Sequence, residues 1–201
     1  TASAKALRTI QQRDLPMLDP SRRVLGIIRP TAETIGNLTE SRHIGVLATE
    51  GTIKSQSYSM EIHKLFPDIH VSGVACPLWA AIVEAGEADS PGADYFVKKR
   101  IDQLMRKDPL IDTIILGCTH YPLLMSSVVK NVPKGVRIMS QGTYVANSLA
   151  DYLKRHPEME RNITQGGTCR YLTTESEQRF SETARIFLHE DVMVNHVDLT
   201  E

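Results

Sequence analysis

The residues best placed to carry chemistry are Cys118, Thr119 and His120, which follow the apolar run 113–116 and a single glycine. A short run rich in β-branched residues that stops at a glycine predicts a buried strand, and the Tyr-Pro pair after His120 predicts a helix start. In α/β proteins, ligands bind where such a strand ends, because the first amides of the following helix point out of the crevice. A cysteine there, beside a histidine, favours the thiolate, so Cys118 is a candidate base or nucleophile.

This stretch is compatible with other interpretations. One alternative is that Cys118 is a structural thiol, buried in the core and packed against a histidine. Cys118 and His120 would also suit a thiol hydrolase, which forms an acyl-enzyme and needs an oxyanion hole. A further interpretation is a ligand-binding domain without catalysis, in which half of a site survives.

The composition is that of an ordinary globular chain, with 201 residues, 41% hydrophobic and 23% charged, and a formal net charge of −1. There is no basic run to attract a phosphate backbone, and no apolar stretch approaches the ~20 residues of a transmembrane helix. We therefore expect neither a nucleic-acid nor a membrane partner. Three cysteines far apart in sequence do not form a disulfide framework, which favours a reducing, cytoplasmic location. Glycine-rich phosphate loops and metal-ligand spacings are lacking, so we expect no cofactor and no metal.

Strand and helix patterns alternate along the chain. Strands are predicted at residues 24–28, 44–48, 69–75, 113–116, 136–139, 168–174 and 192–197. Helices are predicted at residues 1–12, 31–38, 53–66, 78–85, 122–130, 142–155 and 176–188, with another opened by Ser90 and Pro91. This alternation predicts an α/β protein with mostly parallel sheets and helices on both faces.

Several motifs occur in an order that resembles a known family. They are Gly-Cys-Thr-His-Tyr-Pro-Leu-Leu at residues 117–124, the segments 44–55, 75–78 and 82–86, and the opening Thr-Ala-Ser-Ala. Together they resemble the glutamate racemases of the cofactor-independent aspartate/glutamate racemase superfamily, over essentially the whole chain. The resemblance implies a bacterial amino-acid racemase that interconverts L- and D-glutamate and supplies D-glutamate for peptidoglycan. An aspartate racemase, or a related isomerase or decarboxylase of the superfamily, stays open.

Racemisation makes specific demands on a site. The α-proton of an amino acid is weakly acidic, so a base must approach it closely on one face while an acid returns a proton on the other. Two thiols that face each other across the substrate suit this task. The resemblance makes Cys118 one of these bases, His120 the group that assists proton transfer at Cys118, and Glu84 the carboxylate near that histidine.

Hydroxyl groups at strand-to-helix turns are the candidates for substrate binding. Donors there, with the first helical amides, can hold a carboxylate or an amino group, although threonine is also favoured at these positions as an N-cap. The candidate substrate-binding residues are Thr1, Thr49, Thr52 and Thr119, of which Thr1 is assigned by the resemblance. Cys76, which precedes a proline at a strand end, is predicted to be structural, and Cys169 is predicted to lie in a core strand.

The resemblance also implies a plan of two similar domains, each a mostly parallel sheet with helices on both faces, and an active site in the cleft between them. Residues 29–141 would form the second domain, and residues 1–28 and 142–201 the remainder of the first. In the family, a Cys-Asn pair that holds the other catalytic cysteine directly precedes a Thr-Ala-Ser-Ala helix start, so we expect that pair and the opening part of the enzyme before Thr1. We further expect this chain alone to be inactive and the complete protein to be a homodimer.

Overall fold

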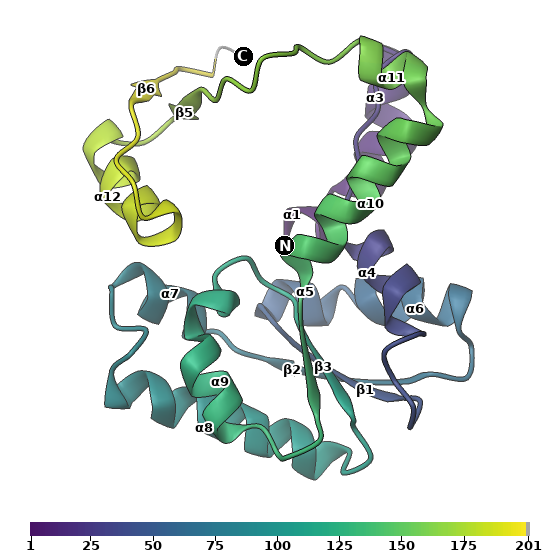
Figure 1. The fold of residues 1–201 in the computed structure, drawn as a ribbon, viewed down its shortest axis with the longest axis vertical. Coiled ribbons are helices and arrows are strands. Elements are labelled where there is room, and N and C mark those ends of the chain that lie inside the picture. Colours follow the sequence, from purple (N-terminus) through teal and green to yellow (C-terminus); the bar gives the residue numbers. More distant parts are fainter. Residues whose placement is uncertain (200–201) are drawn as a thin grey trace.

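The computed structural model describes residues 1–199, and its centre is one parallel sheet (Figure 1). The four strands are β1 (His43–Ala48), β2 (His70–Ala75), β3 (Thr113–Leu116) and β4 (Arg137–Ser140), in the order β2-β1-β3-β4. All neighbouring strands run parallel, and β1 pairs with both β2 and β3. Because the chain moves from β1 outward to β2 and then back across to β3, the strand order reverses between β1 and β3. Doubly wound sheets bind their ligands at this point.

Helices cover both faces of the sheet. On one face lie α4 (Ile28–Ile35) and α6 (Ser57–Leu65), and on the other α7 (Trp79–Glu84), α8 (Pro91–Lys107) and α9 (Met125–Asn131). Alternate strand residues enter the two cores. Val46 and Ile115 pack with α4 and α6, whereas Leu47 and Leu116 pack with α7, α8 and α9. The predicted α/β class, with a parallel sheet between helical layers, is therefore confirmed.

The longest helix, α8, follows directly from its sequence pattern. The hydroxyl of Ser90 accepts a hydrogen bond from the amide of Ala93 at 3.1 Å, and Pro91 occupies the first turn, as predicted. Its apolar residues recur at helical spacing on the face that meets the sheet. The larger side chains that it buries there are Val97, Ile101 and Leu104.

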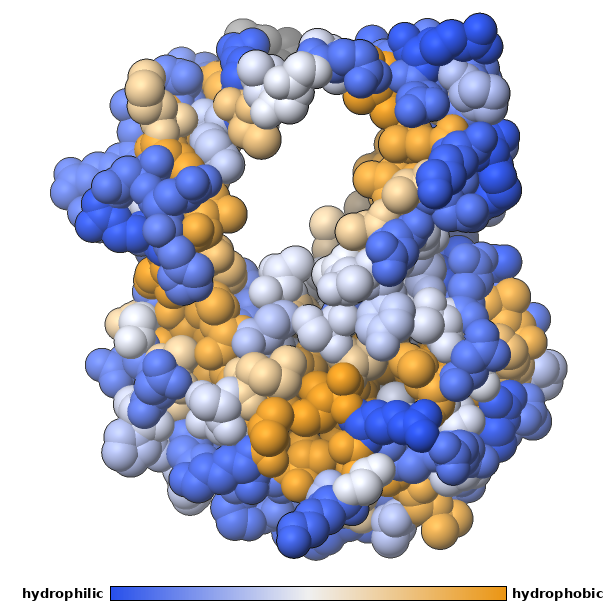
Figure 2. Space-filling model, in the orientation of Figure 1, coloured by the Kyte–Doolittle hydropathy of each residue, from blue (hydrophilic) through white to orange (hydrophobic). Residues whose placement is uncertain are grey.

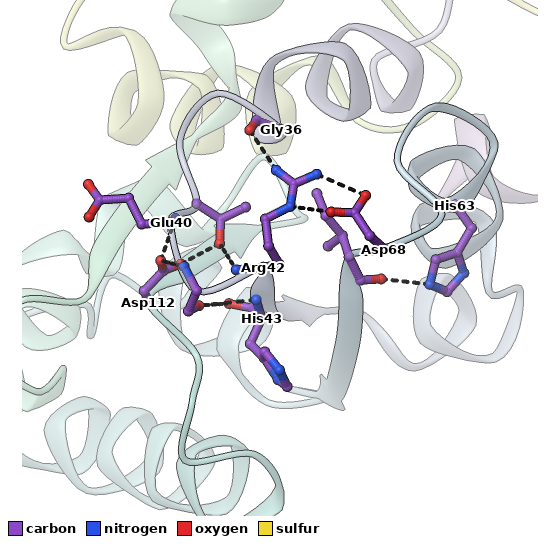
Figure 3. Close-up of polar contacts among 10 residues, drawn as sticks. Gly36, Glu40, Arg42, His43, His63, Asp68 and Asp112 are labelled. Carbon is purple, nitrogen blue, oxygen red and sulfur yellow. Dashed lines mark hydrogen bonds and ion pairs between the residues drawn. The ribbon is translucent and has the colours of Figure 1, made fainter.

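A carboxylate holds the amino-terminal edge of the sheet together (Figure 3). Asp112, just before β3, accepts hydrogen bonds from the hydroxyls of Thr39 (2.7 Å) and Thr113 (2.9 Å). The amides of Glu40 and Ser41 also donate to it, each at 2.7 Å. Burial alone would raise the pKa of Asp112, but these donors stabilise the carboxylate and lower its pKa to about 2. The loop after α4 is thereby tied to the start of β3.

Arg42 links two further loops at the same edge. Its guanidinium donates to both carboxylate oxygens of Asp68, at 2.6 and 3.0 Å, and to the carbonyl of Gly36 at 2.9 Å. This bidentate pair connects the end of α4 with the loop that precedes β2. The starts of β1 and β2 are thus held in register from outside the core.

The remaining segments lie beyond the carboxyl ends of the strands. Residues 1–18 form a nearly continuous helical segment made of α1 (Ala2–Lys5), α2 (Leu7–Thr9), the π-helical turn η1 (Ile10–Asp14) and α3 (Leu15–Leu18). This segment and α10 (Gln141–Arg155), with α11 (Pro157–Arg161), form one arm. A second arm holds α12 (Glu177–Leu188) and the parallel pair β5 (Tyr171–Thr173) and β6 (Val194–His196). Figure 2 shows an opening between the arms, with apolar side chains along both inner margins.

Residues 24–28, predicted as a strand, form no strand. The chain is irregular there, and Ile28 already begins α4. A side-chain amide, that of Gln11, donates to the carbonyl of Val24 at 2.6 Å, where a strand would have needed a neighbouring backbone. An apolar run therefore predicted a strand that has no partner among the described residues.

Other predicted elements have different limits. The helix expected at 53–66 is divided into α5 (Glu50–Lys54) and α6, because Gln56 adopts a left-handed conformation with φ 54°. The helix expected at 122–130 begins as the 3₁₀ turn η2 (Tyr121–Leu124) before α9. The strand expected at 168–174 shortens to β5, because its pairing with β6 covers only Tyr171–Thr173. Helix α11 was not predicted.

Candidate active site

The carboxyl edge of the sheet gathers the residues that the sequence predicted as functional. The amide of Gly117 donates to the carbonyl of Leu47 at 2.8 Å, so the pairing of β3 with β1 continues to the end of both strands. Thr49 and Cys118 therefore leave adjacent strands at the same edge. This is the point at which the strand order reverses.

Cys118, His120 and Glu84 form a continuous series of contacts. Sγ of Cys118 lies 3.9 Å from Nδ1 of His120, and Nε2 of His120 lies 2.9 Å from Oε1 of Glu84. The His120 side chain is 22% exposed and that of Glu84 is 53% exposed. Because a carboxylate only accepts hydrogen bonds, Nε2 is the nitrogen that donates to Glu84, and in the neutral imidazole Nδ1 then has its lone pair on the side of the thiol. This arrangement can accept a proton from the sulfur.

The turn that carries Cys118 packs tightly on β1 and α6. A side chain at Gly117 would place its Cβ 3.0 Å from that of Ala48 and 3.2 Å from the ring of Tyr58, closer than most Cβ contacts, so glycine lets the turn approach without displacing these neighbours. Tyr58 is buried, and its hydroxyl has no hydrogen-bond partner within residues 1–199. Burial raises the pKa of Tyr58 to about 12, so it remains a neutral phenol beneath the turn.

Tyr121 anchors the other side of the same turn. Its buried hydroxyl donates to the carbonyl of Cys76 at 2.9 Å, and its ring packs edge-on against Trp79 with 4.8 Å between centroids. Cys76 is buried too, and its thiol approaches the carbonyl of Val74 at 3.7 Å. Burial raises the pKa of the Cys76 thiol far above its usual range. A neutral core thiol agrees with the structural role predicted for Cys76.

Three threonine hydroxyls form a second group. Oγ1 of Thr49 lies 2.8 Å from Oγ1 of Thr1 and 2.9 Å from Oγ1 of Thr52. Thr49 is also the N-cap of α5 and accepts the amide of Thr52 at 3.4 Å, which is the capping alternative that its position allowed. Thr52 is buried, whereas Thr1 is exposed. Thr119 belongs with the other group, because its hydroxyl lies 3.3 Å from Nδ1 of His120.

The seven predicted site residues thus fall into two groups at one edge of the sheet. After β3 lie Cys118, Thr119 and His120, with Glu84 joined to them; after β1 lie Thr49 and Thr52, with Thr1 joined to them. Within residues 1–199 no hydrogen bond connects the two groups. The pairing of β1 with β3 alone brings them to the same edge.

The prediction that Cys169 lies in a core strand is wrong. Cys169 is exposed and belongs to the irregular segment before β5. Gly166 and Gly167, with φ of 111° and 65°, precede it in a stretch where every side chain from 162 to 170 is exposed. The apolar pattern was too weak there to distinguish a buried strand from a loop.

Two contacts near the site were not predicted. The ring of Phe187, on α12, meets the imidazole of His120 edge-on, with 5.0 Å between centroids and 81° between planes. The hydroxyl of Ser57 donates to the carbonyl of Ala4 at 2.8 Å and so ties the N-terminal helical segment to α6. Helical periodicity predicts that Phe187 lies on the apolar face of its helix, but no local pattern predicts which residue it packs against.

A large cavity of about 980 Å³ lies elsewhere, between the N-terminal helical segment, residues 25–30, α6 and α10. None of the seven predicted site residues lines it. In the described part of the chain, no cluster of three or more His, Cys, Asp or Glu side chains is arranged to bind a metal ion. The helices of residues 1–199 include none that is long and apolar enough to cross a bilayer.

Fold and site together define a class: a doubly wound α/β protein with a cysteine, a histidine and a carboxylate at the switch point of its sheet. Residues 20–149 match the family described as Asp/Glu/Hydantoin racemase. The chain belongs to this family.

Relatives and solved structures agree with that assignment. A glutamate racemase from a Ruegeria species is 36% identical over 203 residues, which cover 96% of this chain and 72% of the relative. A glutamate racemase from Levilactobacillus brevis is 34% identical over 202 residues, which cover 100% of this chain and 70% of the relative. The crystal structure of a glutamate racemase isoform from Bacillus anthracis superposes with a TM-score of 0.84 at 32% identity, over 98% of this chain and 71% of that chain. The family expected from the sequence motifs is confirmed.

Proposed function

We propose that this protein is a glutamate racemase, which interconverts L- and D-glutamate without a cofactor and supplies D-glutamate for peptidoglycan. The relatives from Ruegeria, Levilactobacillus brevis and Bacillus anthracis carry that name. The observation that supports the proposal most directly is the 3.9 Å approach of Sγ of Cys118 to Nδ1 of His120 at the switch point. A thiol that can pass its proton to an imidazole becomes a base able to take a proton from carbon.

In this mechanism Cys118 serves one face of the α-carbon. Nδ1 of His120 first accepts the thiol proton, and the Cys118 thiolate then removes the α-proton of L-glutamate and becomes a thiol again. Glu84, 2.9 Å from Nε2, holds the imidazole and stabilises its protonated form. In the opposite direction the thiol returns its proton to the carbanion and His120 restores the starting state.

The opposite face requires a second acid–base group. Cys76 is buried in the core with a pKa raised by burial, and Cys169 is exposed in the segment before β5, so neither suits this role. We assign the second thiol to a residue outside these 201 residues. By the family resemblance, that cysteine belongs to a Cys-Asn pair that directly precedes a Thr-Ala-Ser-Ala helix start like the one at Thr1.

We propose that the threonine hydroxyls bind the substrate. Thr1, Thr49 and Thr52 form one hydrogen-bonded series at the start of α5, and hydroxyl donors of this kind suit a carboxylate or an amino group. Thr119 lies on the Cys118 side, beside the imidazole. Substrate between the two groups would have its α-carbon within reach of the sulfur.

We also propose the division into two domains, with residues 29–141 as one domain and residues 1–28 and 142–201 as part of the other. The four-stranded sheet and its helices occupy residues 28–140. Among the described residues of the outer segments, the strands are β5 and β6, and two strands with open edges are too few for an independent sheet. Further strands from outside these residues would cover those edges and close the cleft over Cys118.

The complete protein is proposed to be a cytoplasmic homodimer. The three cysteines are free, which suits a reducing compartment. Light scattering on the complete protein checks the oligomeric state, and a monomer at working concentration would reject the dimer.

The function is tested by circular dichroism of enantiopure glutamate. The protein assayed joins residues 1–201 to the part of the Ruegeria relative that lies outside the match. We expect L- and D-glutamate to reach the same mixture, and Cys118→Ser to slow both directions by about 10²–10⁴-fold. Cys169→Ser, which removes the exposed thiol, is the matched control and should retain the rate. Racemisation that survives Cys118→Ser would reject the proposal.

The same samples distinguish the alternatives. Faster racemisation of aspartate than of glutamate would favour an aspartate racemase. An activated ester followed by mass spectrometry would reveal a stable acyl group on Cys118 if the cysteine–histidine pair served a thiol hydrolase.

A further inference from the structure

We propose that Phe187 is a positioning residue that holds the imidazole of His120 against the thiol of Cys118. The inference rests on the proposed function, since it concerns the same cysteine–histidine pair. Phe187 belongs to α12, on the arm that lies above α7 in Figure 1, and not to the sheet domain that carries the pair. Its ring is nevertheless 5.0 Å from the imidazole, centroid to centroid, at 81°.

The other restraints on His120 leave its ring loosely held. Glu84 binds Nε2, but its side chain is 53% exposed and free to change rotamer. At Nδ1 two partners compete, the hydroxyl of Thr119 at 3.3 Å and the sulfur of Cys118 at 3.9 Å. A small rotation of the imidazole would favour Thr119 and break the approach to sulfur.

Phe187 opposes that rotation. An edge-on aromatic neighbour restricts the ring planes that the imidazole can adopt, and such contacts are specific in geometry. Phe187 also packs against the apolar cluster that includes Trp79 and Tyr121, so its own position is supported.

The consequence is a link between the arm and the reactivity of Cys118. When α12 is in place, Nδ1 stays near the sulfur and the thiolate forms readily. When the Phe187 ring is removed, His120 leaves that orientation more often and the thiolate fraction of Cys118 falls. Phe187 touches neither sulfur nor substrate in this scheme, and it acts only through His120.

The test measures the rate at which iodoacetamide labels Cys118 at neutral pH, read by peptide mass spectrometry, in the chimera that joins residues 1–201 to the remaining part of the Ruegeria relative. The background carries Cys169→Ser, because that exposed thiol would compete for the reagent. We expect Phe187→Ala to slow labelling by about two- to tenfold, the range for loss of one edge-on aromatic contact. Phe187→Tyr keeps the ring and should restore the rate. Leu188→Ala, at the next and exposed position of α12, is the matched control.

A double-mutant cycle with His120→Asn separates positioning from general stability. If Phe187 acts through His120, Phe187→Ala has no further effect once His120 is replaced. An equal slowing in both backgrounds would overturn the inference, because Phe187 would then act by another route. Should Phe187→Ala fail to fold by circular dichroism, Phe187→Leu keeps an apolar side chain without the ring and replaces it in the cycle.

The cycle also distinguishes this inference from the proposed function. Slower labelling in His120→Asn with an unchanged rate in Phe187→Ala would overturn the role of Phe187 and leave the cysteine–histidine pair intact. An unchanged labelling rate in His120→Asn would show that His120 does not activate Cys118, and it would overturn both the proposed mechanism and the role of Phe187.

Discussion

At the scale of single residues, the candidate site depends on which nitrogen of His120 carries the proton. Glu84 accepts from Nε2 at 2.9 Å, so Nδ1 faces the Cys118 sulfur without a hydrogen. Glu84 is far from Cys118 in sequence and exposed, yet by our proposal it selects the tautomer that lets the thiol lose its proton. We therefore expect a surface residue to affect the reaction without touching the substrate.

Replacing Glu84 by Gln tests this control. A glutamine amide can donate to Nε2, which would place the proton on Nδ1 and point it at the sulfur. We expect racemisation in the complete protein to fall by about 10²-fold, in the range for loss of a positioned proton acceptor. Glu87→Gln, an exposed neighbour with the same change in charge, is the control. Equal activity of the Glu84→Gln and Glu87→Gln variants would contradict the role of Glu84 in setting the tautomer of His120.

A second prediction concerns the asymmetry of two bases. In Cys118→Ser the hydroxyl is far less acidic than a thiol, so racemisation should fall in both directions, since each turnover uses both groups. Elimination from β-chloroglutamate needs a base on one face only, because chloride leaves and no proton is returned. By family resemblance Cys118 acts on the L-enantiomer, so D-β-chloroglutamate should still release chloride and the L-enantiomer should be slow. Equal loss with both enantiomers would favour a single base.

At the scale of elements, the two edges of the sheet have different tasks. The carboxyl edge leaves hydroxyl, thiol and imidazole groups facing outward, whereas the amino edge is closed by hydrogen bonds to carboxylates. Asp112 connects the loop after α4 to β3 through four donors. The hydrogen bonds at the amino edge therefore hold the strand register on which the geometry of the carboxyl edge depends.

Asp112→Asn is expected to destabilise the sheet in a pH-dependent way. The folded pKa of about 2 lies below the unfolded value of 3.8, so the contribution is complete above pH 4 and is lost as the pH falls toward 2. The shift corresponds to roughly 2 kcal/mol at neutral pH. Urea unfolding at several pH values measures it. Asp102→Asn, on the exposed face of α8, should cost less than about 1 kcal/mol, and a pH-independent loss in Asp112→Asn would contradict the argument.

At the scale of the whole molecule, stability is unevenly distributed. The sheet of residues 43–140 has helices on both faces, whereas β5 and β6 pair only with each other. Apolar side chains line both margins of the opening between the arms in Figure 2. In folded proteins, strand edges and apolar faces of this kind are normally covered by further structure.

Residues 1–201 alone should accordingly be inactive and unevenly protected. We expect amide hydrogen exchange to be much slower in β1 and β3 than in β5, β6 and α10, because opening of the arms breaks few buried contacts. Mass spectrometry of exchange, with the chimera assayed for racemisation as reference, measures both properties. Uniform protection, or racemisation by residues 1–201 alone, would contradict the need for a second thiol and further strands.

The amino-acid sequence by itself determined the elements and the local part of the site. The spacing of the apolar residues predicted α8 and the four strands of the sheet, because such patterns depend only on backbone geometry. Cys118 and His120 are two residues apart on one turn, so the sequence also placed them near each other. The family motifs then indicated the fold class and the reaction. The predicted ends of elements were wrong where a residue adopts positive φ, as at Gln56, and a predicted strand was wrong where it has no partner among the described residues, as at Val24.

Only the tertiary structure decided which distant residues meet. It set the ring of Phe187 against the imidazole and left Cys169 exposed. It also gave the contact between Glu84 and His120 and the burial of Cys76, which the family resemblance and the thiol's position at a strand end had led us to expect. Burial and contact across elements depend on how helices and strands pack, and no local period encodes this. A glutamate late in a helix and a phenylalanine on an amphipathic helix look ordinary until the sheet and the arm bring them to the same histidine.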